Sequence, residues 1–354
     1  MTAWLWMPAF LPLAITLINV LAWRRPRPGA RPTGLVSALV PARNEAENID
    51  ECLAALLTTD VDEVLVLDDA STDDTAARVE AWAARDARVR LLRGQGPPPG
   101  WFGKAAACEA LRRAARGEWL LFVDADVRVE PDVLRRLGPA TVDLVTAVPR
   151  QEAIGPVERL VIPLLHLTYC SWLLLPTVRR SRNPAVLAAN GQLIFARRDA
   201  LAQLDGFAPV RAAVVDDMAL VKAARRAGLA VDFLDGTELA RCRMYRDGPA
   251  VIDGFSKNLY PGIGGTPFAL AVVLVLYVST LLLPWLAAPW SPYAWLGIAA
   301  NLMQRTLLAV RFRHDVRDVP LHPLSIGLFV YIALRSAWWS WRGKGSWRGR
   351  PVAA

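Results

Sequence analysis

Two aspartates stand one residue apart directly after an apolar run, in Phe122-Val123-Asp124-Ala125-Asp126. Carboxylate oxygens at this spacing suit a hard divalent cation, which takes oxygen ligands from carboxylates and phosphate groups together. A solvated turn is the plain alternative for such a pair. We treat Asp124 and Asp126 as candidate metal ligands, with Mg²⁺ and Mn²⁺ both open, and weigh them together with the other polar motifs.

Two more polar motifs follow apolar runs nearer the N-terminus. The first contains Pro41 and Glu45, and the second begins with Asp68 and Asp69. An Asp followed by Ser or Thr after a strand is also an ordinary helix cap. Adjacent carboxylates exceed what a cap needs, because the second negative charge costs energy unless something binds it. The N–H and O–H donors of a nucleobase or ribose would bind it.

A glycine-rich segment, Gly100-Trp101-Phe102-Gly103-Lys104, opens a predicted helix between these motifs. Glycine lets a ligand approach the backbone, a helix N-terminus offers free N–H groups, and Lys104 supplies a positive charge. These features suit a diphosphate. The motif is weak by itself and gains weight from its place in the series.

Two neighbouring carboxylates, Asp216 and Asp217, open a helix downstream of Ala189-Asn190-Gly191-Gln192. Asp217 could be a first-turn carboxylate that the helix dipole favours. The functional alternative is a general base that takes a proton from an acceptor hydroxyl. We therefore take Asp217, with Asp216 beside it, as the candidate catalytic residues.

The elements that must position these residues alternate between strands and helices. Short β-type runs predict strands at 35–40, 63–67, 88–92, 119–123 and 144–147, and helical patterns predict helices at 46–57, 74–85 and 104–115. Such alternation predicts an α/β fold with right-handed crossovers and a mostly parallel sheet. Ligands then gather at the carboxyl ends of the strands, where the motifs stand.

The N-terminal apolar run, within residues 1–23, is long enough for a transmembrane helix. A signal peptide is disfavoured because no positive charge precedes the run and no small-residue cleavage site follows it. The basic flank Arg24-Arg25-Pro26-Arg27 places the following domain in the cytoplasm by the positive-inside rule. This predicts a multi-pass protein of the cell membrane with a cytoplasmic catalytic domain over 34–262.

Further apolar segments predict a C-terminal membrane region over 267–341 and a basic cytoplasmic tail over 342–354. Segments 268–286 and 295–310 could form a hairpin through the bilayer. For 323–341 we favour a surface-lying or re-entrant segment, because a crossing would put the basic tail outside. The stretch at about 160–176 is interrupted by Pro163, and we interpret it as an interfacial helix.

Composition limits the partners. The net charge of +8 could indicate nucleic acid, but many arginines stand beside apolar runs, which fits anionic lipid better. A hydrophobic fraction of 54% beside 21% charged residues requires the two kinds to be segregated along the chain. The four cysteines are widely spaced and indicate neither a disulfide framework nor a zinc site. We expect a bilayer and no nucleic acid.

As an ordered set, the motifs resemble those of family 2 glycosyltransferases, an inverting group with a nucleotide-binding domain of the GT-A type. The resemblance covers roughly residues 34–262. It implies base and ribose contacts near Pro41, Glu45, Asp68 and Asp69, metal-diphosphate binding at Asp124 and Asp126, and a catalytic base at Asp217.

A finer resemblance is to the membrane subgroup that glycosylates carotenoids and related polyprenyl-type lipids. It involves Cys242-Arg243-Met244-Tyr245, Gly254-Phe255-Ser256-Lys257-Asn258 and Trp347-Arg348-Gly349-Arg350. The Q-x-x-R-W motif of processive polysaccharide synthases is absent from the sequence, which favours a single transfer.

The resulting hypothesis is transfer of one sugar from a UDP-sugar, with UDP-glucose preferred, to a hydroxyl or carboxylate of a membrane lipid. Lys104 and Asp124 complete the expected donor contacts. Two alternatives stay open. One is transfer to a polyprenyl phosphate or a growing polysaccharide, and the other is a membrane-tethered nucleotide-sugar-binding protein without turnover.

Overall fold

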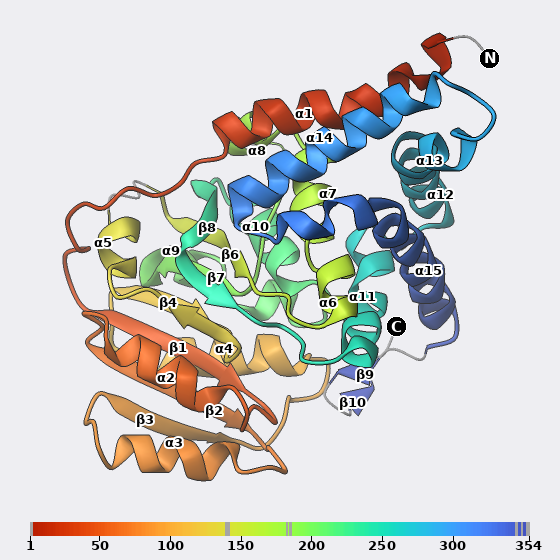
Figure 1. Ribbon diagram of the computed structural model, residues 1–354. Coiled ribbons are helices and arrows are strands. Elements are labelled where there is room, and N and C mark those ends of the chain that lie inside the picture. The colour runs from red at the N-terminus through yellow and green to blue at the C-terminus, as the bar shows by residue number, and fades with distance from the viewer. Residues whose placement is uncertain are drawn as a thin grey trace. The chain divides into compact units, whose positions relative to one another are not determined.

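The computed structural model describes residues 3–138, 142–181, 183, 186–343, 346–347 and 350–351 (Figure 1). The chain divides into two compact units. The sheet unit comprises Arg24–Arg150 and Val178–Cys242, and the helical unit comprises Met1–Trp23, Gln151–Thr177 and Arg243–Ala354.

Within the described residues, the sheet unit is built on one eight-stranded sheet in the order β3-β2-β1-β4-β7-β6-β8-β5. The strands are β1 Val36–Ala42, β2 Glu63–Asp69, β3 Val89–Gly94, β4 Trp119–Val123, β5 Val127–Val129, β6 Leu144–Gln151, β7 Leu193–Arg197 and β8 Val231–Cys242. All five strands expected from the apolar runs are present, with ends shifted by at most four residues. β7 corresponds to the strand-like run at 193–196, which follows the Ala189-Asn190-Gly191-Gln192 motif, whereas β5 and β8 are strands that the sequence patterns did not indicate.

The expectation of a mostly parallel sheet is wrong for the second half of the sheet. β1 is parallel to β2 and β4, and β2 is parallel to β3. β7 is antiparallel to both β4 and β6, and β5 is antiparallel to β8. A parallel neighbour requires a crossover back to the starting edge of the sheet. β7 instead begins at the same edge of the sheet where β6 ends, so the two strands run in opposite directions.

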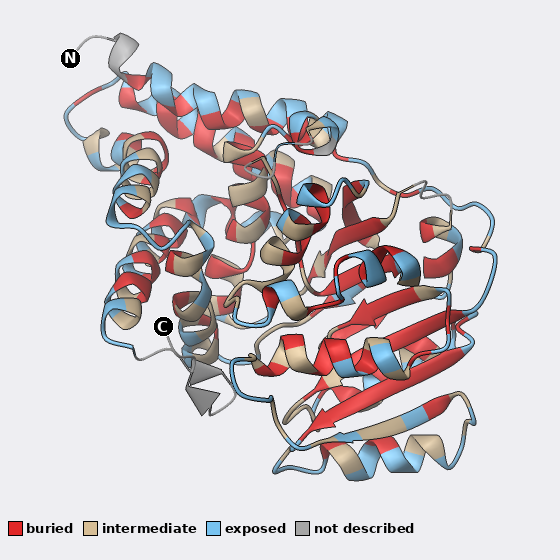
Figure 2. Cartoon of the chain, turned by 180° about the vertical axis from the view of Figure 1, so that it is seen from behind, coloured by how far each residue is buried: buried red, intermediate tan, exposed pale blue. Residues whose placement is uncertain are grey.

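Helices of the sheet unit pack their apolar faces against the strands. They are α2 Ile49–Leu57, α3 Thr75–Ala83, α4 Gly103–Ala114, α5 Val133–Leu137, α9 Arg198–Gln203 and α10 Asp216–Arg226. One core cluster joins Leu111 of α4 to Leu39, Leu65 and Phe122 of three strands, all nearly inaccessible to solvent. Figure 2 shows the central strands almost entirely buried. Burial of this apolar surface fixes the strand ends that carry the polar motifs.

The helical unit contains the apolar segments. Its helices are a 3₁₀ turn Ala3–Ala9, α1 Phe10–Ala22, α6 Pro156–Val161, α7 Leu164–Trp172, α11 Gly248–Gly262, α12 Pro267–Tyr277, α13 Leu283–Ala287, α14 Ala294–Phe312, a 3₁₀ turn Val316–Leu321 and α15 His322–Trp341. A π-helical segment, Val278–Leu282, joins α12 to α13. α8, Leu175–Arg180, spans the division between the units.

The predicted interfacial helix at 160–176 is broken into α6, α7 and the start of α8. Asn19 of α1 satisfies the backbone at the second break. Its Nδ2 donates to the carbonyl oxygens of Cys170, at 3.0 Å, and Leu173, and its Oδ1 accepts from the Leu175 N–H at 3.0 Å. One buried amide therefore replaces the helical hydrogen bonds that the break removes.

Two helices among the described residues are long and apolar enough to cross a membrane: Pro267–Ala287 and Val316–Trp341. Trp6–Ala22 is a shorter apolar helix. The interpretation of 323–341 as surface-lying or re-entrant stays a prediction. Of the predicted basic tail, residues 344–345, 348–349 and 352–354 lie outside the described residues, and so does the Arg348-Gly349 half of the tail motif.

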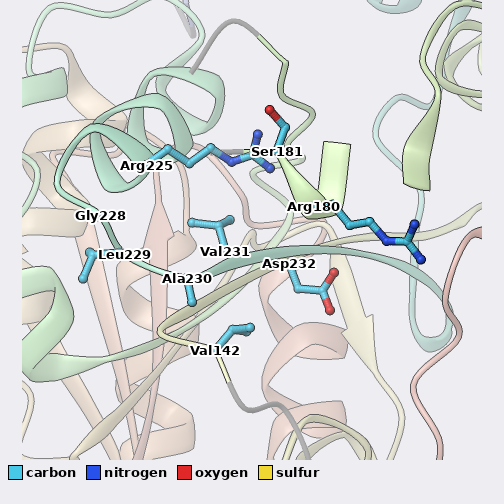
Figure 3. A pocket seen from close by; sticks show the side chains of 9 residues that line it. All are labelled: Val142, Arg180, Ser181, Arg225, Gly228, Leu229, Ala230, Val231 and Asp232. Atoms are coloured by element: carbon cyan, nitrogen blue, oxygen red, sulfur yellow. The ribbon is translucent and has the colours of Figure 1, made fainter. Parts of the chain in front are cut away.

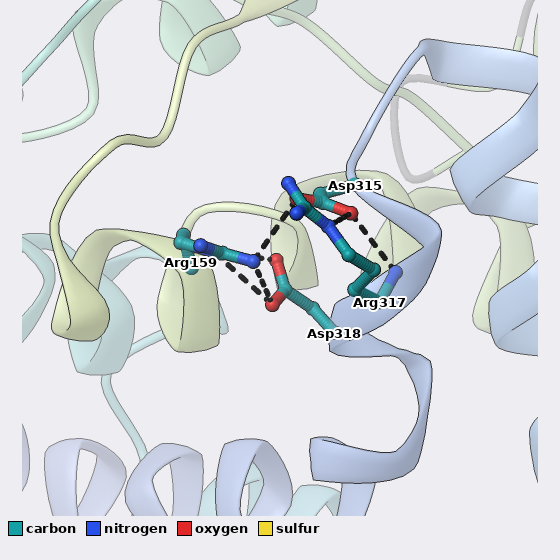
Figure 4. Close-up of polar contacts among 4 residues, drawn as sticks. All are labelled: Arg159, Asp315, Arg317 and Asp318. Atoms are coloured by element: carbon teal, nitrogen blue, oxygen red, sulfur yellow. Dashed lines mark hydrogen bonds and ion pairs between the residues drawn. The ribbon is translucent and has the colours of Figure 1, made fainter.

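A group of ion pairs joins two segments of the helical unit (Figure 4). Arg159 of α6 donates through Nε and Nη2 to the Asp318 carboxylate, at 2.9 and 2.6 Å, and Nη2 also reaches Asp315 at 3.0 Å. Arg317 pairs with Asp315 at 2.7 Å. A planar guanidinium on two carboxylate oxygens fixes geometry as well as charge. The connection between α14 and α15 is thereby tied to α6.

Candidate active site

The loops that follow β1 and β2 are locked together. Asn44 and Ala70 both adopt left-handed backbone conformations, with φ of 52°. The Asn44 N–H donates to Ser71 Oγ at 2.9 Å, and the Thr72 N–H donates to Asn44 Oδ1 at 2.8 Å. Left-handed non-glycine residues cost energy and concentrate at functional sites. This interlocked pair fixes the edge of the sheet where Glu45 and Asp69 lie.

Asp68 and Asp69 end β2 and are 5% and 4% exposed. Asp68 Oδ2 accepts a long hydrogen bond of 3.4 Å from the Ser71 N–H, whereas Asp68 Oδ1 is buried without a hydrogen-bond partner. Pro41 and Ala42 of β1 lie beside Leu67 and Asp68 in the strand register. A buried carboxylate oxygen without a partner is costly unless a ligand donates to it.

Lys104 joins the glycine-rich motif to the carboxylate pair. It stands in the first turn of α4, and its Nζ lies 2.7 Å from the Asp124 carboxylate and 3.4 Å from the Gly191 carbonyl oxygen. Burial disfavours the ammonium charge, but Asp124 and Asp216 outweigh burial and raise the pKa of Lys104 above its usual value. The lysine is therefore a fixed positive charge at the end of β4.

Asp126 follows Asp124 in the turn before β5. Its Oδ1 is shielded from solvent and has no hydrogen-bond partner. Burial, with the negative charges of Asp124 and Glu45, raises the pKa of Asp126 to about 7. A divalent cation relieves both penalties because it replaces the missing partner and offsets the clustered charge.

The donor chemistry at Asp124 and Asp126 thus fits a hard divalent cation. Within the part of the chain that the structure describes, no group of three or more His, Cys, Asp or Glu side chains forms a complete ligand set. A cation held by two carboxylates takes its other ligands from water and phosphate oxygens, as Mg²⁺ usually does.

Asp217 lies beside Lys104 and Gly191. A methyl group added to Gly191 would stand 3.2 Å from Asp217 Cβ and 3.3 Å from Lys104 Nζ. The Met218 N–H donates to Asp217 Oδ1 at 2.7 Å. Burial, together with the neighbouring Asp216 charge, raises the pKa of Asp217 to about 6. A carboxylate with this pKa can accept a proton near neutral pH.

Glu45 is held by a relay that the sequence patterns did not indicate. Asn48 Nδ2 donates to Glu45 Oε2 at 2.8 Å, and Asn48 Oδ1 accepts from Arg128 Nη2 at 3.3 Å. Arg128 of β5 also donates to Glu51 at 2.9 Å. An Asn six residues after the end of β1 and an Arg two residues after Asp126 were visible signals, but nothing local in the sequence connects them.

The sheet unit therefore brings together Lys104, Asp124, Asp217 and Gly191 through direct contacts, with Asp126 and Glu45 within electrostatic reach. Asp68, Asp69 and Pro41 lie on the neighbouring strands β2 and β1. A hollow of about 210 Å³ elsewhere in the unit is lined by Val142, Arg180, Ser181, Arg225 and Gly228–Asp232 (Figure 3). None of the predicted site residues lines it, and it lies where β6 and β8 begin.

Comparison with known families decides what this site belongs to. Residues 37–196, which include β1, β2, β4 and the carboxylate pair, match the model of glycosyl transferase family 2. Residues 37–196 form a family 2 glycosyltransferase domain. The predicted resemblance to family 2 glycosyltransferases is thereby confirmed for this domain. The matched range ends within β7, before Asp216 and Asp217.

Two relatives extend the similarity beyond this domain. The 4,4'-diaponeurosporenoate glycosyltransferase of Staphylococcus haemolyticus is 24% identical over 78% of this chain and 72% of its own length. The enzyme of the same name from Staphylococcus aureus (strain MRSA252) is 26% identical over 69% of this chain. The chain spans 65% of that second relative's length.

The fold also agrees with a solved structure. A mannosyltransferase from Pyrobaculum calidifontis, in complex with GDP-Man and Mn²⁺, superposes with a TM-score of 0.56 at 20% identity. The superposition covers 94% of this chain and 99% of that one. The expected α/β fold of the GT-A type is confirmed.

Proposed function

We propose that this family 2 glycosyltransferase is an inverting, metal-dependent enzyme that moves one sugar from a UDP-sugar to a membrane lipid. The observation that carries the proposal is the Asp126 carboxylate. It is half-buried near Asp124, its Oδ1 is shielded from solvent without a hydrogen-bond partner, and its pKa is raised to about 7. Without a bound cation this arrangement is costly, because a shielded carboxylate oxygen has no partner and stands near other negative charges.

In this proposal Asp124 and Asp126 hold the divalent cation, Mg²⁺ or Mn²⁺. When bound, such a cation withdraws negative charge from the leaving nucleoside diphosphate. Lys104 adds a second positive charge at the same edge and orients Asp124. Asp68 and Asp69 face the base and ribose, with Pro41 and Glu45 beside them. These residues stand at the ends of β1, which neighbours β4, and of β2, which neighbours β1.

Asp217 is the proposed general base, with Asp216 supporting its raised pKa. A hydroxyl acceptor must lose its proton as the new glycosidic bond forms, and Asp217 takes that proton. A carboxylate acceptor is already ionised and needs Asp217 only for positioning. The single displacement by the acceptor at the anomeric carbon inverts its configuration.

The polarity of the helical unit supports a membrane location. α1 exposes Phe10, Leu17 and Leu21, whereas it buries Thr16 and Asn19 completely. α14 likewise buries Asn301 and Gln304 and exposes Trp295 and Val310. Gln304 Nε2 donates to Thr16 Oγ1 and Ser171 Oγ, both at 2.8 Å. Polar groups inside and apolar groups outside are what a hydrocarbon surrounding favours.

The acceptor proposal rests on this surface and on the relatives. Both relatives carry the name of a glycosyltransferase for diaponeurosporenoate. An acceptor of that kind is an apolar polyene acid that dissolves in the bilayer. We place the catalytic domain on the cytoplasmic side of the cell membrane, because Arg24, Arg25 and Arg27 follow the N-terminal apolar helix.

The test is an assay of membranes containing the chain with labelled UDP-glucose and, in parallel, labelled GDP-mannose. The proposal expects UDP release, a single labelled lipid in the organic extract, and loss of both on chelation of divalent cations. A labelled polymer in the aqueous phase would contradict single transfer. Donor binding without any release of nucleotide would contradict an enzyme. A mass spectrum of lipids from cells with and without the chain would identify the acceptor.

A further inference from the structure

Gln192 closes the Ala189-Asn190-Gly191-Gln192 motif and is buried, with 7% of its surface exposed. Its backbone carbonyl oxygen accepts a hydrogen bond of 3.2 Å from the Asp124 N–H. Its own N–H donates to Asn190 Oδ1 at 3.0 Å, and the Asn190 N–H donates to Thr146 Oγ1 at 3.2 Å. The motif is therefore built onto the strands β6 and β7 and supports the backbone of Asp124.

The side chain of Gln192 reaches the other member of the carboxylate pair through Cys242. Gln192 Nε2 lies 3.1 Å from Cys242 Sγ. Cys242 ends β8, is 1% exposed, and stands opposite Val127, the residue after Asp126, in the register of β5 and β8. The Cys242 thiol lies within electrostatic reach of the Asp126 carboxylate.

The chemistry of the groups decides which of them can donate a proton. The Gln192 amide nitrogen can only donate, so the sulfur accepts from it. The thiol has one proton, which it can donate to the Asp126 carboxylate. Asp126 Oδ1 is left buried and without a hydrogen-bond partner. A thiol in this place orients the carboxylate without adding charge.

We propose that Gln192 and Cys242 are positioning residues that orient Asp126 toward the divalent cation while Gln192 fixes the backbone of Asp124. This inference rests on the proposed metal-dependent function. Gln192 and Cys242 are 50 residues apart in the sequence. The Gln192 backbone holds Asp124, and the Gln192 side chain reaches toward Asp126 through Cys242. Groups that orient a ligand without touching the metal commonly change its affinity about 10- to 100-fold when removed.

The test measures binding of Mn²⁺ rather than turnover. The purified full chain in detergent is titrated with Mn²⁺ in the presence of UDP, and free Mn²⁺ is followed by electron paramagnetic resonance. Gln192→Leu removes the amide donor but keeps the backbone carbonyl, and Cys242→Ala removes the thiol. We expect each to raise the Mn²⁺ dissociation constant about tenfold or more. Cys242→Ser keeps a donor and an acceptor, so its Mn²⁺ dissociation constant should be close to that of the wild-type chain.

Cys170→Ser is the matched control, since Cys170 is another buried cysteine but belongs to α7 of the helical unit. It should leave the Mn²⁺ dissociation constant unchanged. Thermal unfolding of each variant shows whether it is folded, and if Gln192→Leu does not fold, the two Cys242 variants decide.

Two results would overturn the inference while leaving the proposed function standing. One is unchanged Mn²⁺ affinity in Cys242→Ala, and the other is a Cys242→Ser variant as weak as Cys242→Ala. If the wild-type chain bound no Mn²⁺, with or without UDP, the metal site of the proposed function would be overturned instead. Asp126→Asn, which must lose Mn²⁺ binding if that site is correct, separates the two cases.

Discussion

Lys104 Nζ and the Asp124 carboxylate lie 2.7 Å apart, although the residues are 20 positions apart and come from different elements. Lys104 belongs to the first turn of α4, and Asp124 follows β4. Both are about a quarter exposed. The pair places a positive charge and a candidate metal ligand at one edge of the sheet, where a diphosphate would contact both.

Replacing Lys104 by Met should strongly reduce turnover. The change keeps the length of the side chain but removes the charge, so Asp124 loses its partner and the diphosphate loses a stabilising cation. We expect kcat/KM for the donor to fall about 100-fold, as for loss of one preorganised electrostatic contact. Lys222→Met, on an exposed position of α10, is the control and should be neutral. Equal activity of the two variants would contradict the role of Lys104.

The pH dependence of turnover should report Asp217. Its pKa is raised to about 6, mainly by burial and then by Asp216. The base is active when deprotonated, so with a hydroxyl acceptor kcat/KM should be flat above about pH 6 and fall roughly tenfold per pH unit below it. Asp217→Asn should abolish turnover and leave donor binding intact.

A carboxylate acceptor gives a different result for the same measurement. Asp217→Asn would then keep much of its turnover, and the acid limb would follow the pKa of the acceptor. Full turnover of Asp217→Asn with a defined hydroxyl acceptor would show that Asp217 is not the base.

Gly191→Ala should disturb the site without unfolding the chain. The added methyl group would stand 3.2 Å from Asp217 Cβ and 3.3 Å from Lys104 Nζ, closer than ordinary packing allows. Both side chains must give way by a few tenths of an ångström. A misplacement of about 1 Å at a reacting group can cost about 100-fold in rate, so a smaller shift costs less. We expect a loss of kcat/KM of about tenfold. Gly327→Ala is the control, because its methyl group would meet nothing within 4 Å.

Asn19→Ala should destabilise the helical unit. It would leave the carbonyl oxygens of Cys170 and Leu173 and the N–H of Leu175 with one fewer partner in a buried place. Unsatisfied buried groups suggest a loss of about 2 to 4 kcal/mol in the free energy of unfolding. Urea unfolding in detergent would measure it, with exposed Asn258→Ala as the control. Equal unfolding curves for the two variants would contradict the capping role.

The sequence by itself determined the family and the edge of the sheet where the site lies. Apolar runs of strand length, each followed by polar residues, place Glu45, Asp68 and Asp124 at the carboxyl ends of β1, β2 and β4. These strands are parallel neighbours, so their ends meet whatever the details of packing. The order of the motifs indicated the family, and the match over residues 37–196 confirms it for that domain.

Only the tertiary structure decided which of these residues touch and what supports them. The antiparallel direction of β7 brings Gly191 and Gln192 to the end of β4, and β8 brings Cys242 to Asp126. Such contacts join segments far apart in the chain, and they depend on how strands pair and helices pack. No periodicity or local motif encodes that pairing, because each segment alone is compatible with several neighbours. The carboxylates were therefore predictable one by one, and their partners were not.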